Sequence, residues 1–146
     1  MDFERCSEDC SQINIVVGEM GRQFRINNAN RLLIKKVQVD GCLIDDERLR
    51  CDYLFEIEQA THCIIYLELK GSDLDHAFRQ LVATMGYCGE RHKSCKRVCH
   101  IVASRVPRAG PKVQTLKRMM VQKYRTLLYV NTQVANIDVT QHPYNS

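Results

Sequence analysis

Two neighbouring apolar runs constrain the fold of this 146-residue chain more than any other feature of its sequence. They cover residues 51–57 and 63–70, and the polar residues 58–62 between them predict the turn of a β-hairpin. In the second run, isoleucine and leucine fall on both faces of the expected strand, which is typical of a strand in the middle of a sheet. Glu68 and Lys70 lie in that same strand, and burying such charges costs free energy. This cost is the first indication of chemistry in the chain.

The segments around the hairpin alternate between strand and helix patterns. We expect strands over residues 31–44, 98–106, 126–130 and 134–139, a helix from Ser72 as its N-cap to Gly86, and a second helix over residues 111–124. Residues 1–30 form an uncertain N-terminal element, with a short helix expected over residues 3–13, and residues 141–146 are expected to be a flexible tail. Together these elements predict a single domain over residues 1–146. Its expected fold class is α/β, with a central mixed β-sheet flanked by helices.

The chain shows no pattern of an export signal or a membrane span. Residues 1–5 are acidic and lack the basic and apolar regions of a signal peptide. No apolar run approaches the length that a bilayer requires. We therefore expect a cytoplasmic, intracellular protein with no membrane partner, in which the eight cysteines are reduced thiols.

Three cysteines and two histidines between residues 88 and 100 leave a zinc site open as an alternative. The spacing is C-x6-C-x3-C-H, with His92 inside the first interval. Structural zinc sites are typically built from cysteine pairs that are closer together than this. Free thiols and loop histidines are therefore the preferred interpretation, and a zinc-stabilised nucleic-acid binder is the alternative.

Charge is distributed unevenly along the chain. Residues 1–90 contain 10 lysines and arginines against 16 acids, whereas residues 91–146 contain 11 against a single acid, Asp138. A basic run by itself is most often a solvated face, but beside a phosphate-cleaving site it would indicate a nucleic-acid surface. The residues from which we expect phosphate contacts are Arg91, Lys93, Lys96, Arg97, Lys112, Lys117 and Arg118.

Two acids and a lysine of the hairpin suggest a metal-dependent hydrolase. Asp52 and Glu68 are 16 residues apart on neighbouring strands, which the hairpin can bring together. Converging carboxylates repel each other unless one is protonated or a cation lies between them. Mg²⁺ needs only one or two protein carboxylates and keeps several waters. Lys70 is on the same face as Glu68, where its ammonium group could orient a water or stabilise developing charge on a phosphate.

The pattern of Asp52, then Glu68-Leu69-Lys70 on the next strand, then a helix with Gln80, resembles the PD-(D/E)XK nuclease superfamily. The core of that superfamily is a helix, a three-stranded meander, a helix and a further strand, and residues 31–104 resemble the part after the first helix. The resemblance implies a restriction-endonuclease-like core. It also implies that Asp52 and Glu68 bind the metal, that Lys70 is the catalytic lysine, and that Gln80 supports the site.

The chain departs from that superfamily in two places. Cys51 stands where a proline is expected before the aspartate. Some branches add an acid from the first helix, for which Glu4, Glu8 and Glu19 are open candidates.

The sequence therefore predicts a nuclease that depends on Mg²⁺ (or Mn²⁺), with DNA as the expected substrate and a homodimer implied by the resemblance alone. DNA versus RNA and endo- versus exonuclease action stay open. The alternative is a non-catalytic nucleic-acid- or protein-binding regulatory module on the same fold. A simpler interpretation of Glu68 and Lys70 is an ion pair at a strand end.

Overall fold

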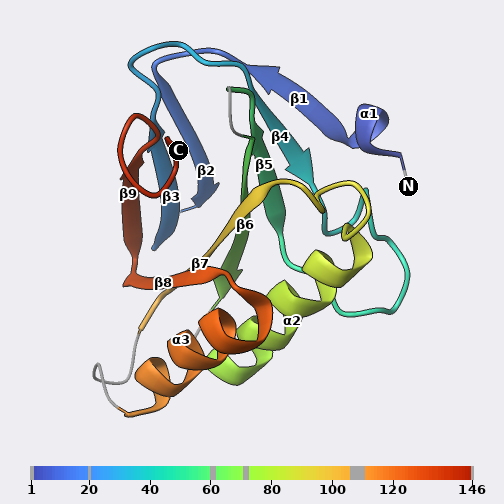
Figure 1. Ribbon diagram of the computed structural model, residues 1–146, viewed down its shortest axis with the longest axis vertical. Helices are drawn as coiled ribbons and strands as arrows, with labels where there is room; N and C mark the ends of the chain where they lie inside the picture. The colour runs from blue at the N-terminus through green and yellow to red at the C-terminus, as the bar shows by residue number, and fades with distance from the viewer. Residues whose placement is uncertain (1, 20, 60–61, 71–72, 106–110, 146) are drawn as a thin grey trace.

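A computed structural model describes the chain except residues 1, 20, 60–61, 71–72, 106–110 and 146 (Figure 1). The side chains of Glu19, Lys70 and Pro111 also lie outside the described part. The helices are α1 (Phe3–Cys6), α2 (Leu74–Tyr87) and α3 (Pro111–Tyr124). The strands are β1 (Ser7–Cys10), β2 (Asn14–Glu19), β3 (Arg22–Asn27), β4 (Ile34–Gln38), β5 (Tyr53–Ile57), β6 (Cys63–Lys70), β7 (Lys96–Ala103), β8 (Leu127–Thr132) and β9 (Val134–Asp138).

The strands form two sheets. The larger has the order β1-β4-β5-β6-β7-β8, and the smaller has the order β2-β3-β9. Strands β4, β5 and β6 pair antiparallel as a meander, and α2 then connects β6 to β7, which pairs parallel to β6. The expected hairpin is confirmed, with β6 in the interior of the larger sheet, and the expected α/β class with a mixed sheet is confirmed as well.

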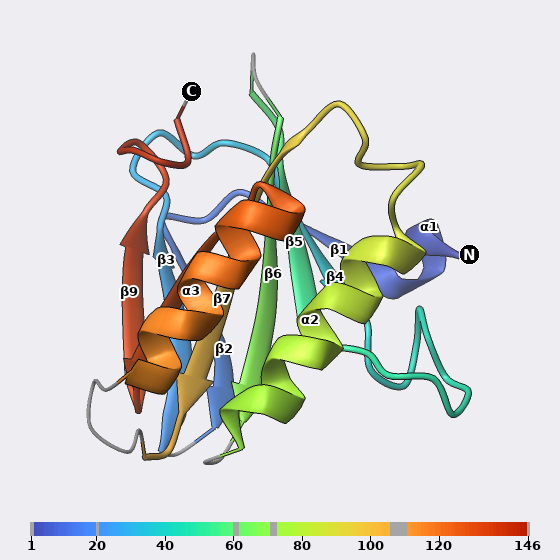
Figure 2. The ribbon, with the colours of Figure 1, turned by 60° about the horizontal axis from the view of Figure 1, so that its bottom comes forward.

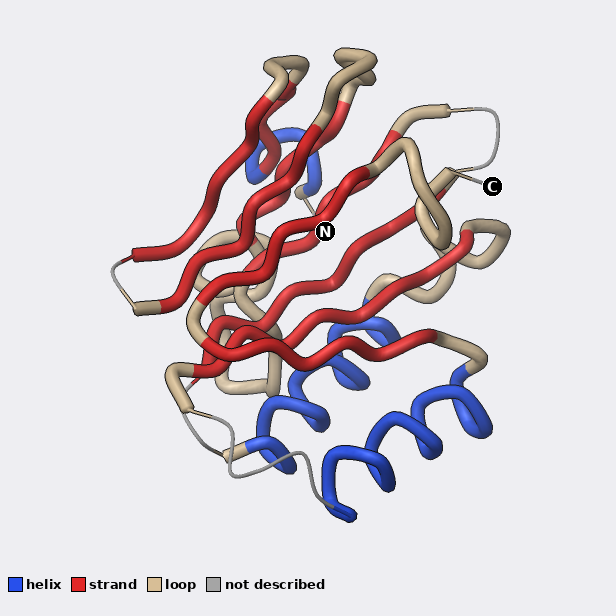
Figure 3. The backbone as a smooth tube through the Cα atoms, turned by 90° about the vertical axis from the view of Figure 1, so that its left-hand side faces the viewer, coloured by secondary structure: helices blue, strands red, loops and turns tan. Residues whose placement is uncertain are grey.

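The larger sheet is covered differently on its two faces. Helices α2 and α3 pack on one face, and the three-stranded sheet packs on the other, as Figures 2 and 3 show. Strand β6 explains the arrangement: Ile64 and Tyr66 belong to the core on the helix side, whereas Ile65 and Leu67 belong to the core between the sheets. Among the described residues, the expectation of flanking helices therefore holds for one face only.

The N-terminal residues differ most from the expectation. The helix expected over residues 3–13 is the single turn α1, and the chain then enters the edge strand β1. Strand β3 was not predicted, although Phe24 and Ile26 are buried and alternate with exposed Arg25 and Asn27, the period-two pattern of a half-buried strand. Gly18 permits the β2–β3 pairing, because its φ is +110° and a Cβ there would collide with the carbonyl oxygen of Arg22.

Helix α2 begins with Asp73 as its N-cap, whose carboxylate accepts a hydrogen bond from the backbone N–H of His76 at 3.0 Å. The expected N-cap, Ser72, lies outside the described residues. The helix places its apolar face on the larger sheet through Leu74, Ala77, Phe78, Leu81 and Met85. No described helix has the length and apolar composition needed to cross a membrane.

Two further expectations are wrong for named residues. Pro143 and Tyr144 belong to the segment expected to be a flexible tail, but both are buried, and Tyr144 packs in the core between the sheets. Cys6 and Cys42 form a disulfide, while the other six cysteines are free thiols. The disulfide links α1 to the loop after β4, two segments that the sequence does not place together.

Candidate active site

Asp52 is held just before β5 by backbone hydrogen bonds to β6 and to the turn after β4. Its N–H donates to the carbonyl oxygen of Leu67 on β6 at 3.1 Å. Its own carbonyl accepts from the N–H of Val39 at 3.0 Å and from that of Asp40 at 3.3 Å. These contacts fix the backbone that carries the Asp52 side chain.

The Asp52 carboxylate lies against the backbone of β6. Its Oδ2 atom accepts a hydrogen bond from the N–H of Leu69 at 2.8 Å. Leu69 is the residue between Glu68 and Lys70, and the antiparallel pairing of Tyr53 with Leu67 continues toward Glu68. The structure therefore brings Asp52 to the end of β6 that carries the other two predicted residues.

Glu68 is an acid in the interior of the sheet. Glu68 is only 2% exposed, and its backbone pairs with that of Ile101 in β7. Strand alternation puts Glu68 on the same face as Ile64 and Tyr66, the face that α2 covers. A buried acid of this kind needs compensating partners to be ionised.

The thiol of Cys51, the residue before Asp52, is fully buried and has a raised pKa. Burial raises its pKa well above the usual value, the hydrogen bond to Thr84 lowers it, and the charges of Glu68 and Asp52 raise it further. Cys51 packs in the core on the helix side, which is the face of β6 on which Glu68 lies, and Asp52 is the next residue in the chain. The backbone at Cys51 is thus part of the site even though the thiol is not a candidate nucleophile.

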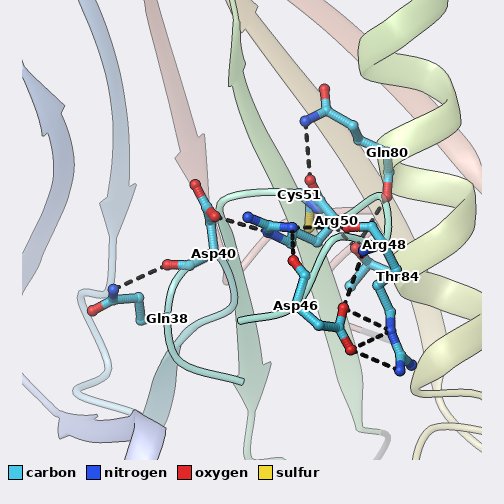
Figure 4. Close-up of polar contacts among 8 residues, drawn as sticks. All are labelled: Gln38, Asp40, Asp46, Arg48, Arg50, Cys51, Gln80 and Thr84. Carbon is cyan, nitrogen blue, oxygen red and sulfur yellow. Dashed lines mark hydrogen bonds and ion pairs between the residues drawn. The ribbon is translucent and has the colours of Figure 1, made fainter. Parts of the chain in front are cut away.

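Helix α2 supports this backbone with two polar side chains (Figure 4). Gln80 Nε2 donates to the carbonyl oxygen of Arg50 at 3.0 Å. Thr84 Oγ1 accepts from the N–H of Cys51 at 2.8 Å and donates to the carbonyl oxygen of Gln80 at 3.0 Å. Gln80 therefore acts on the chain just before Asp52.

Sequence reasoning missed Thr84. It is fully buried and lies four residues after Gln80, on the same face of α2. A polar residue on an otherwise apolar helix face is a usable signal, because a buried hydroxyl needs a partner.

The loop before Asp52 is ordered by charged side chains, which Figure 4 also shows. Arg50 Nε is 2.9 Å from Asp40 Oδ1, and its guanidinium also donates to the carbonyl oxygens of Asp46 and Arg48. Arg48 lies 4.6 Å over the ring of Tyr87 at the end of α2. These contacts fold residues 40–50 against α2 beside the site.

A pocket of about 290 Å³ opens at Asp52, lined by Gly18, Arg22, Asp52, Tyr53 and Leu69. It lies where the β2–β3 hairpin meets the beginning of β5. Arg22 brings a cation to this pocket from outside the basic run of residues 91–125, and no pattern in the sequence points to it.

The structure separates the predicted basic residues into two groups. Strands β6 and β7 are parallel, with Cys63 paired to Lys96 and Lys70 paired to Ala103. Residues 91–97 therefore lie at the end of β6 opposite to Glu68, about 17 Å away along the strand. The loop that carries them is at the top of Figure 2, whereas the C-terminal ends of β6 and β7 are at the bottom.

Several side chains of this distant group have partners within the protein. Arg91 forms two hydrogen bonds with Glu56, at 2.7 and 3.0 Å. Lys93 forms an exposed ion pair with Glu90 at 3.5 Å, and Arg97 donates to the carbonyl oxygen of Tyr124 at 2.8 Å. Lys96 begins β7 beside them.

The second group lies on α3, whose first turn is at the same end of the sheet as Glu68 (Figure 2). Lys112 forms an ion pair with Asp75 of α2 at 2.6 Å. Lys117 and Arg118 follow on the next turns, Arg118 being exposed. The side chain of Lys70, the predicted catalytic lysine, lies outside the described part.

The zinc alternative gains no support from the described residues. Within them, no group of three or more histidines, cysteines or acids could hold a metal ion. His92 is hydrogen-bonded to Glu56 and Tyr66, and His100 to Tyr144. The two histidines therefore take part in separate buried networks.

Comparison of the chain with protein-family models, curated proteins and solved structures found no match. The case for a function rests on the arrangement of Asp52, Glu68 and Gln80 described above.

Proposed function

We propose that this protein is a Mg²⁺-dependent nuclease that hydrolyses phosphodiester bonds in DNA. Its active site would lie where the start of β5 meets the C-terminal end of β6. The hydrogen bond from the Leu69 N–H to Asp52 Oδ2 carries the proposal. It puts the Asp52 carboxylate beside Leu69, whose neighbours in the strand are Glu68 and Lys70.

The order of elements supports the proposal. An antiparallel meander of β4, β5 and β6, then α2, then the parallel strand β7, is the succession that defines the greater part of a PD-(D/E)XK core. The departure lies before the meander, where α1 is a single turn and the strands β2 and β3 join a second sheet. We therefore propose a restriction-endonuclease-like core with an added sheet.

The acids of the site fit Mg²⁺. Asp52 and Glu68 would supply the two carboxylates: Asp52 accepts a hydrogen bond from the N–H of Leu69, the residue that follows Glu68. Mg²⁺ uses one or two carboxylates and keeps its remaining waters, so a third protein ligand is not required. When bound, the ion would polarise the scissile phosphate and lower the pKa of the attacking water.

The side chains at the site would bind the cation, orient the attacking water and contact the substrate. Asp52 and Glu68 hold the cation, and Lys70 orients the attacking water or stabilises the charge that develops on the phosphate. Gln80 positions Asp52 by holding the carbonyl of Arg50. Arg22 lines the pocket beside Asp52 and would contact a phosphate of the substrate.

Cleavage of supercoiled plasmid and of labelled DNA and RNA oligonucleotides, with Mg²⁺ or Mn²⁺, tests the proposal. We expect the wild type to cut and Asp52→Asn, Glu68→Gln and Lys70→Ala to cut at least about 100-fold more slowly. Asp52→Asn is a sharp variant, because the amide oxygen can still accept the Leu69 hydrogen bond while the charge is lost.

Lys123→Ala is the matched control, since Lys123 is exposed, lies in the last turn of α3 and is not among the expected phosphate contacts. Cleavage that survives in Asp52→Asn and Lys70→Ala contradicts the proposal. If the wild type binds DNA with a steep salt dependence but cuts nothing, the non-catalytic module is the better interpretation. If it neither binds nor cuts DNA, a module that binds a protein partner becomes the preferred interpretation.

Sedimentation of the same samples tests whether the protein forms a homodimer, which stays a prediction.

A further inference from the structure

A second pocket lies on the far side of the larger sheet from Glu68. It has a volume of about 260 Å³ and is formed by β8, β9 and the segment 141–144. His100 of β7 forms part of its wall and packs on Phe24 of β3 with ring centroids 4.9 Å apart, so its ring points toward the three-stranded sheet. The pocket shares no lining residue with the one at Asp52 and is therefore separate from it.

His100 has one ring nitrogen with a partner and one without. His100 is 2% exposed, and its Nε2 atom is 2.7 Å from the hydroxyl oxygen of Tyr144. Nδ1 is buried and has no hydrogen-bond partner within the described part of the chain. Burial lowers the pKa of His100 to about 3, so the ring is neutral at physiological pH. A buried polar atom without a partner is rare in native proteins and calls for an explanation.

The rest of the pocket combines a ring surface with hydrogen-bonding edges. Tyr129 stacks on His100, with centroids 5.1 Å apart and planes 20° apart. Asn131, Asn136 and Gln141 add side-chain amides, each able to donate and accept hydrogen bonds.

The charge of the pocket selects against anions. Asp138 lines it as an acid, and its Oδ1 also accepts hydrogen bonds from the hydroxyl and N–H of Thr140. Those hydrogen bonds lower the pKa of Asp138, so its carboxylate is ionised. The described lining contains no lysine or arginine. His142 lines the pocket as well, but the described lining offers a phosphate group no lysine or arginine to offset the Asp138 carboxylate.

We propose that this pocket binds an uncharged planar heteroaromatic ring, namely the base of a free nucleoside. An apolar cavity of about 150 Å³ holds benzene, so about 260 Å³ is enough for a larger ring with polar edges. Tyr129 supplies a stacking surface, and the three amides pair with the edges of the ring. The proposal does not depend on nuclease activity.

Titration calorimetry with adenosine, guanosine, cytidine and thymidine, and with their 5′-monophosphates, tests the proposal in the absence of divalent cations. We expect at least one nucleoside to bind saturably and more tightly than its monophosphate. Asn136→Ala and Gln141→Ala are expected to weaken binding about tenfold, which corresponds to about 1.4 kcal/mol. Both residues are exposed, so the fold of these variants is expected to be unchanged.

Two controls separate this pocket from the rest of the molecule. Gln114→Ala changes an exposed amide on α3, and Asp52→Asn changes the proposed active site; both are expected to leave nucleoside affinity unchanged. The proposal is overturned if no nucleoside binds at concentrations up to about 10 mM. It is also overturned if the two pocket variants bind like wild type, if Asp52→Asn abolishes binding, or if the monophosphate binds more tightly.

Discussion

Replacing Glu56 with glutamine is expected to cost this protein a large share of its stability. Glu56 lies in β5, and its side chain is only 11% exposed. Its carboxylate forms two hydrogen bonds with Arg91 and one with His92 Nε2, the last at 2.6 Å. His92 Nδ1 is in turn 2.6 Å from the hydroxyl of Tyr66 on β6. The carboxylate thus ties the loop before β7 to the two central strands.

The magnitude follows from the pKa of Glu56. Burial raises this pKa, but the hydrogen bonds and charges of His92 and Arg91 outweigh burial and lower it from 4.5 to about 2. A pKa unit corresponds to about 1.36 kcal/mol, so the ionised carboxylate contributes about 3 kcal/mol to folding. Because the pKa is lower in the folded state, this contribution is present above pH 4.5. It is lost as the pH falls toward 2.

Urea unfolding at a series of pH values measures this contribution. At pH 7 we expect Glu56→Gln to lower the free energy of unfolding by about 3 kcal/mol. The difference from wild type should shrink between pH 4.5 and pH 2, because the wild-type carboxyl becomes protonated there. Glu90→Gln is the matched control: Glu90 is 88% exposed, so its loss should cost less than about 0.5 kcal/mol.

Two results would refute this reasoning. The first is a Glu56→Gln variant that matches the wild type at pH 7 to within about 0.5 kcal/mol. The second is a stability difference that stays constant from pH 7 to pH 2, which would show that packing rather than charge is responsible.

Three further substitutions test other parts of the structure by urea unfolding. Thr84→Val leaves the buried N–H of Cys51 without its acceptor and should cost about 1–3 kcal/mol, whereas Thr84→Ser keeps the hydroxyl and should cost less. Gly18→Ala should destabilise by about 2 kcal/mol, because it combines a collision with Arg22 and a positive φ; Gly86→Ala in α2 has open space and should not destabilise. Cys42→Ser opens a disulfide between residues 36 apart and should cost about 3–4 kcal/mol, and reductant should remove the difference from wild type. Equal stability of wild type and Cys42→Ser without reductant would contradict the disulfide.

The hairpin and the two long helices could be predicted because their signals are local. Strand alternation and helical spacing depend on residues within a few positions of one another, so β5, β6, α2 and α3 follow from the sequence. Glu68 was found for the same reason, because it is a polar residue in a segment whose pattern calls for burial. Gln80 was selected through the resemblance to the nuclease superfamily. Asp52 was found because the hairpin fixes the partner of each residue on its two strands.

Contacts between distant segments could not be predicted in this way. Thr84 meets Cys51 across 33 positions, and Arg22 reaches the Asp52 pocket from a strand that the sequence did not indicate. Residues 91–125 form one basic run in the sequence, but β7 carries the chain from one end of the sheet to the other. The run is therefore divided between two ends of the molecule.

The amino-acid sequence alone determined the hairpin, the two long helices and the choice of Asp52, Glu68, Lys70 and Gln80 as candidates. Only the tertiary structure decided that a second sheet covers one face, that Arg91 is engaged by Glu56, and that Tyr144 closes a pocket over His100. The physical reason is that backbone periodicity is encoded by neighbours in the chain. The pairing of buried polar groups depends on which distant segments packing brings within hydrogen-bonding distance.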